Sequence, residues 1–96
     1  MATVKVTLTK IVDDTFPVWG AFEFTDQSGK VIVIHEKLPV VGIEVDGLRL
    51  PLDVELECDV ISASNASVLI DTTKPHAIED IRGQTQFQVS ASLVRN

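Results

Sequence analysis

The chain is poor in the residues that most often carry catalysis or crosslinks. Its 96 residues include one cysteine, Cys58, two histidines and no tyrosine. A lone cysteine excludes an intrachain disulfide and any zinc site built from several thiolates. No glycine-rich phosphate loop, nucleophile elbow or metalloprotease motif occurs. The sequence therefore predicts no cofactor and no metal, and it favours a binding protein over an enzyme.

Basic residues and long apolar runs are also scarce. Eight Lys and Arg stand against fourteen Asp and Glu, and the formal net charge is −6. Nucleic acid is disfavoured as a partner, because binding to a phosphate backbone depends on Lys and Arg displacing counterions. No segment has the length to cross a bilayer, and the first residues lack the basic start and apolar run of an export signal. We expect a cytoplasmic protein with no membrane contact.

What the chain has in quantity is β-branched side chains. Val, Ile and Thr make up 30 of the 96 residues, a composition that suits strands and disfavours long helices. A chain of this length is typical of one domain with one core, and no repeat or linker divides it. We expect a single β domain over residues 1–96.

One stretch, residues 52–60, alternates without a break between apolar and acidic side chains. Successive side chains of an extended chain point to opposite sides, so the pattern predicts a strand with a core face and an anionic face. The apolar set is Leu52, Val54, Leu56, Cys58 and Val60. The acidic set, here called the carboxylate row, is Asp53, Glu55, Glu57 and Asp59. The row is either a solvated face paired with cross-strand lysines such as Lys5 or Lys10, or a docking surface for a basic protein.

The remaining sequence predicts further strands. Alternating or apolar runs bounded by turn residues predict strands at 3–12, 18–25, 31–37, 67–72 and 84–94, with a short hairpin at 43–50. The spacing of Ile78 and Ile81 predicts at most one short helical turn, or an ordered loop, near residues 75–82. The expected fold is all-β, a small antiparallel barrel or sandwich of six to seven strands. In an open sandwich, the strand at 31–37, which is apolar on both faces, would be covered by a second copy in a homodimer.

The densest polar cluster lies late in the chain, at Asp71, His76, Glu79 and Asp80. A histidine beside carboxylates can bind a divalent metal or act as a general base. Ordinary loop capping accounts for the same residues without any site.

Two single residues also stand out. Trp19 has the strand parity opposite to Phe22 and Phe24, so it is either covered by a loop or free to anchor an interface. Cys58 lies on the apolar parity beside carboxylates, which would raise its pKa and make the thiol inert.

Turn residues and aromatic residues recur in seven segments that cover most of the chain. These segments are Phe16-Pro17-Val18-Trp19-Gly20, Glu23-Phe24-Thr25-Asp26, Gly29-Lys30, Lys37-Leu38-Pro39-Val40-Val41, Asp71-Thr72-Thr73-Lys74-Pro75, Ile78-Glu79 and Gly83. Together they resemble a group of small uncharacterised bacterial proteins. That resemblance implies a bacterial, cytoplasmic origin, and it carries no activity to transfer.

The leading functional hypothesis is a non-enzymatic binding or adaptor module. It would dock a protein partner, or itself, through the carboxylate row and Trp19, as an immunity or inhibitor protein for a basic enzyme would. Two alternatives remain open. One is a small-ligand or enzymatic barrel with a site near Asp71, His76, Glu79 and Asp80, and the other is a self-assembling structural subunit.

Overall fold

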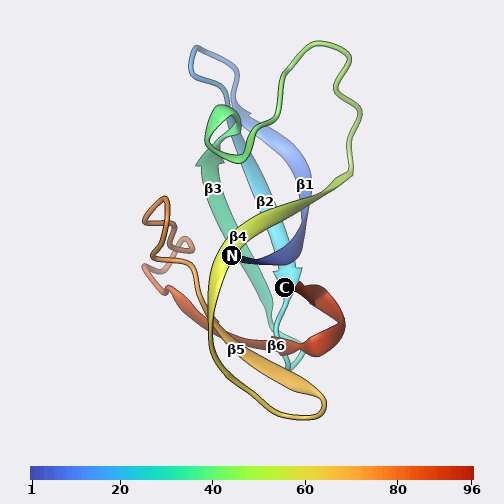
Figure 1. The fold of residues 1–96 in the computed structure, drawn as a ribbon. Helices are drawn as coiled ribbons and strands as arrows, with labels where there is room; N and C mark the ends of the chain where they lie inside the picture. Colours follow the sequence, from blue (N-terminus) through green and yellow to red (C-terminus); the bar gives the residue numbers. More distant parts are fainter.

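Seven strands form one antiparallel sheet that curls into a half-barrel, as the computed structural model of residues 1–96 shows (Figure 1). The strand order is β3-β2-β1-β4-β5-β6, and β7 pairs with β1 off this path. The only helical segments are two 3-10 turns, η1 and η2, so the all-β expectation is confirmed. The elements are β1 Ala2–Asp13, β2 Trp19–Thr25, β3 Val31–Lys37, η1 Leu38–Val41, β4 Leu52–Ala63, β5 Ser67–Asp71, β6 Gln86–Ser90, η2 Ala91–Leu93 and β7 Val94–Arg95.

Strand β1 is the centre of the sheet because it pairs with three other strands. Its residues 2–8 pair with β4, residues 7–13 pair with β2, and Thr3 and Val4 also pair with β7. The alternation of β1 breaks at Lys10, where the register against β2 shifts, as expected for a bulge. A bulge increases the local twist and so helps the sheet to curl.

The core fills the inside of the curl with apolar side chains from six of the seven strands. Phe22 and Phe24 are buried, as the parity of β2 predicts. Phe24 meets Phe87 of β6 edge to face, with ring centroids 5.3 Å apart. This contact joins two strands that are distant in the sheet order, so it holds the curl together.

The terminal strands of the sheet are each tied to a loop from elsewhere in the chain. The carbonyl of Val33 in β3 accepts the N–H of Ile81 at 2.9 Å. The carbonyl of Gln88 in β6 accepts the N–H of Gln27 at 2.7 Å. Each contact partly satisfies a strand edge that would otherwise be open to another chain.

The expected hairpin at 43–50 does not form. The Leu48 N–H donates to the Val45 carbonyl at 3.1 Å, so the turn exists, but no strands flank it. Arms of three residues that do not join a larger sheet bury too little surface to be stable as strands.

Of the two structures expected near residues 75–82, a short helical turn or an ordered loop, the loop forms. These residues are turns and loop, and Ala77 has a left-handed φ of 53°, which a right-handed helix does not tolerate. Ile78 is buried, and its carbonyl accepts the buried Thr72 hydroxyl at 2.7 Å. The apolar residues of this segment therefore belong to a loop, and Ile78 of that loop packs into the core.

The strand expected over 84–94 is interrupted. It becomes β6, the turn η2 and the two-residue β7, and the Ser90 hydroxyl caps η2 by accepting the Ser92 N–H at 3.3 Å. The turn redirects the chain from β5 to β1. The predicted core face of β4 is likewise shorter than expected, because Leu52 and Val60 are 36% and 38% exposed.

Candidate functional site

The carboxylate row lies on the outer face of β4. Leu56 and Cys58 are buried, while Asp53, Glu55 and Glu57 are exposed. The predicted division into an apolar and an anionic face is therefore confirmed for the middle of the strand. Because β4 pairs on at least one edge along its length, with β1 over residues 52–58 and with β5 from Asp59 onward, the carboxylates are held on a fixed backbone.

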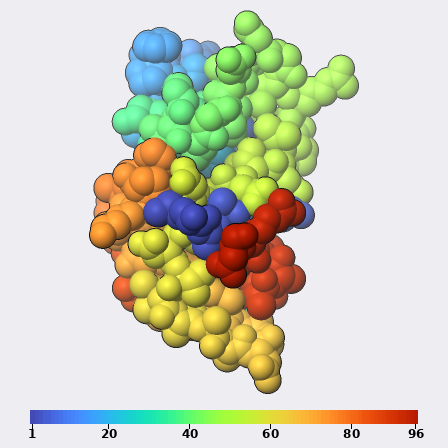
Figure 2. Space-filling model, in the orientation of Figure 1, coloured from blue at the N-terminus to red at the C-terminus, as the bar shows by residue number.

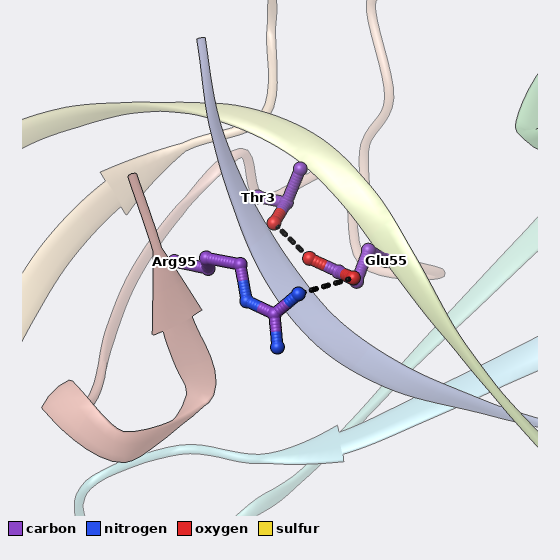
Figure 3. A network of polar contacts seen from close by, with 3 residues as sticks. All are labelled: Thr3, Glu55 and Arg95. Carbon is purple, nitrogen blue, oxygen red and sulfur yellow. Dashed lines mark hydrogen bonds and ion pairs between the residues drawn. The ribbon is translucent and has the colours of Figure 1, made fainter.

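The negative charges of the first half of the row, Asp53 and Glu55, are paired with side chains of β1 and β7. Lys5 Nζ lies 3.3 Å from Asp53, which also accepts the Thr7 hydroxyl at 2.8 Å. Glu55 accepts the Thr3 hydroxyl at 2.5 Å and faces Arg95 at 3.4 Å (Figure 3). The hydrogen bond from Thr7, and then Lys5, lower the pKa of Asp53 below its usual value. Of the two lysines suggested by the sequence, Lys5 pairs with the row and Lys10 does not.

The second half of the row has no Lys or Arg partner. The nearest basic group to Glu57 is His76, whose Nε2 lies 3.8 Å from the carboxylate. Asp59 stands opposite Asp71 of β5 in the strand register, so both point to the same side. We call Glu57, Asp59 and Asp71 the anionic end. It concentrates negative charge on the outer surface of two paired strands.

Asp71 was grouped by sequence with the late polar cluster, and the structure separates that cluster. Asp71 accepts the Thr73 N–H at 2.8 Å and the Gln86 side-chain amide at 3.1 Å, and the Thr73 hydroxyl is the main cause of the lowered pKa of Asp71. Asp80 is buried, where it accepts the N–H groups of Arg82 and Gln84 at 2.9 and 2.8 Å. These contacts are those of loop caps.

The remaining members of the cluster do not complete a site. His76 turns toward Glu57 of β4, and Glu79 is exposed. No group of three or more His, Cys, Asp or Glu side chains is placed to hold a metal ion. The four residues therefore do not converge, and Asp71 instead extends the acidic surface of β4.

Trp19 is half-buried and is in part covered by a neighbour. The Lys37 ammonium lies 5.1 Å from the centre of its ring, and the two residues are partners in the β2–β3 register. Such a cation–π contact leaves part of the indole accessible. Trp19 is on a different strand pair from the carboxylate row, separated from it by β1.

A shallow depression lies beside the row, over the outer face of β1. It has a volume of about 470 Å³ and is lined by Thr7, Thr9, Glu23 and Asp53 among others. A second depression of about 370 Å³ adjoins it and shares Lys5, Asp53 and Leu93. Both are open to solvent, whereas small-molecule sites are usually enclosed.

Sequence reasoning missed the partners of the row that come from far along the chain. Arg95 reaches Glu55 only because β7 returns to pair with β1, and no local pattern reveals that pairing. The pairing of Asp59 with Asp71 depends on the register of the β4–β5 hairpin, which shifts between Val60 and Ser62. Among the partners that were missed, only Thr3 and Thr7 could have been found from the local sequence, because the threonines of β1 alternate with its buried residues and so point outward.

The structure contains no helix with the length and hydrophobicity needed to span a bilayer. Searches against protein-family models, curated proteins and solved structures returned no match to this chain.

Proposed function

We propose that this chain is a non-enzymatic protein-binding module that docks a basic partner through the carboxylate row. The observation that carries the proposal is the anionic end, where Glu57, Asp59 and Asp71 lie together without a Lys or Arg counter-charge. Carboxylates that lack a Lys or Arg counter-charge within the chain are available to a partner of opposite sign.

Two further features support this function. The row stands on a paired strand, so little conformational entropy is lost when a partner binds. Its charge also exceeds that of its two ion-pair partners, Lys5 and Arg95, so the face keeps a negative potential that would steer a basic protein toward it. An immunity or inhibitor protein for a basic enzyme would use such a face.

The test is affinity capture from an extract of the source cells with three versions of the protein. The first is the natural chain, the second carries Glu57→Gln and Asp59→Asn, and the third carries Glu44→Gln, which removes an exposed acid outside the row. We expect one protein to be retained at low salt by the first and third versions only, and to be released at high salt.

Two outcomes would contradict the proposal. Capture that survives neutralisation of Glu57 and Asp59, or capture of nothing by the natural chain at either salt concentration, would show that the row is only a solvated face.

A further inference from the structure

The first half of β4 has an open edge. Residues 52–58 pair with β1 along one edge, and no other backbone or side-chain hydrogen bond reaches their backbone N–H and C=O groups. In an antiparallel strand alternate residues direct these groups to opposite edges. Every second residue of this stretch therefore presents an unpaired donor and acceptor away from β1.

The two outermost strands of the sheet each receive a backbone hydrogen bond from a loop. β3 receives a hydrogen bond from Ile81, and β6 receives one from Gln27. β4 pairs with β5 only from Asp59 onward. The open stretch of β4 is thus the longest part of the sheet that no other segment touches through the backbone.

Space exists alongside this edge. A depression of about 270 Å³ is lined by Glu55, Leu56 and Glu57 on one side, and by residues 39–42 and His76 on the other. The yellow-green residues of β4 lie at the surface in Figure 2, next to the green segment that follows β3. A further strand could therefore approach β4 from this side.

The carboxylate row decides what kind of strand fits. A second copy of this chain pairing at the same edge would bring two rows together, and like charges on neighbouring strands destabilise a sheet. A segment with Lys or Arg at alternate positions would instead place its cations beside Asp53, Glu55 and Glu57. Acidic residues on an open edge thus discourage self-association and favour one class of partner.

We propose that the partner docks by adding an extended basic segment, with Lys or Arg at every second position, as a new strand on the open edge of β4. This inference rests on the function proposed above and specifies how the partner is held. Backbone hydrogen bonds to β4 supply the affinity, and the alternating cations supply the selectivity.

The test uses a short capped peptide of alternating Lys and Val and two derivatives that are N-methylated on one or the other set of alternate residues. Only one set of amides can face β4. We expect the parent peptide and one derivative to bind alike, and the other derivative to bind about tenfold or more weakly, since each methyl group removes a hydrogen bond. The measurement is the change in peptide fluorescence anisotropy on titration.

A second measurement locates the site. Amide hydrogen exchange should be slowed by the parent peptide at alternate residues of 52–57, while the amides that bond to β1 are unchanged. The charge-reversed variant Glu55→Lys, Glu57→Lys should bind a peptide of alternating Glu and Val in place of the basic one.

The outcomes separate this inference from the function on which it rests. Equal binding of both N-methylated peptides, with affinity lost at high salt, would overturn strand addition and leave docking through the carboxylate row intact. No binding of any peptide at millimolar concentration overturns strand addition, and the capture experiment then decides the proposed function by itself. A stable dimer of the free protein at micromolar concentration would contradict the role of the row in keeping copies apart.

Discussion

The Cys58 thiol is unreactive because it lies on the buried face of β4. Its side chain is fully buried, and burial together with the neighbouring Asp59 raises the pKa of the thiol to about 11. The thiolate, which is the reactive form, is therefore nearly absent at neutral pH.

We expect Cys58 to resist iodoacetamide at pH 8 in the native protein and to react readily in denaturant. Because the folded pKa lies above the ordinary value of 9.0, the native state holds its proton more tightly than the unfolded state does. The contribution to stability is complete below pH 9 and is lost as the pH rises toward 11. Urea unfolding at pH 8 and pH 10 measures this loss, and a Cys58→Ala variant should show less of it.

Gly20 is required by packing. A Cβ atom at this position would lie 2.5 Å from Leu8 Cδ1 and 2.9 Å from Leu38 Cδ2. We expect Gly20→Ala to lower the free energy of unfolding by about 1–3 kcal/mol, as overpacked cores do. Since Leu8→Val removes the nearest atom, the same substitution should cost less in a Leu8→Val background. Equal costs in the two backgrounds, measured by urea unfolding, would exclude overpacking as the cause.

At the scale of elements, the packing of β6 against the core depends on the Phe87 side chain. The ring is buried against Phe24, and no other aromatic contact links β6 to the far strands. We expect Phe87→Ala to reduce the free energy of unfolding by about 3–5 kcal/mol. Gln88→Ala, on the exposed face of the same strand, should change it by less than about 0.5 kcal/mol. Thermal unfolding followed by circular dichroism compares the two variants.

The elements that sequence predicted well are those whose pattern is local. Alternation along β1 and along residues 52–60 specified both strands and, for β1 and the middle of β4, the faces that they bury, because a side-chain period of two is a property of the strand itself. The expectations that failed or were left open share another cause. Whether Ile78 lies in a helical turn or in a loop that packs into the core, and whether the strand at 84–94 continues through Ala91, depends on strands far away in sequence.

In the candidate site, too, some features could be predicted from the local pattern and others could not. The outward direction of Asp53, Glu55 and Glu57 followed from parity. Arg95 as a partner of Glu55, and Asp71 as a neighbour of Asp59, followed from strand register, which no single segment encodes. The open edge of β4 depends on which strand is missing beside it, and that is a property of the whole sheet.

At the scale of the whole molecule, acid should weaken the fold through four aspartates spread over its surface. Hydrogen bonds lower the pKa values of Asp13, Asp26, Asp53 and Asp71 below the ordinary value of 3.8. In each case the unfolded state binds the proton more readily, so the contribution to stability is present above pH 3.8 and is lost as the pH falls through the lower native values.

Urea unfolding between pH 2 and pH 6 should show this decline. Thr7→Val removes the hydroxyl that is the main cause of the shift at Asp53. We expect that variant to lose less stability on acidification than the natural chain does. A decline that is already complete at pH 5 would point to other groups.

The pairing of Thr3 with Arg95 also determines the stage of folding at which the sheet is complete. β7 follows far along the chain, so β1 is synthesised well before the strand that pairs with its Thr3 and Val4. The central strand is therefore fully bonded only after β7 has been made, and contacts of such long sequence separation fold slowly. Until then β1 and β4 expose edges to which a chaperone, or another nascent chain, can bind.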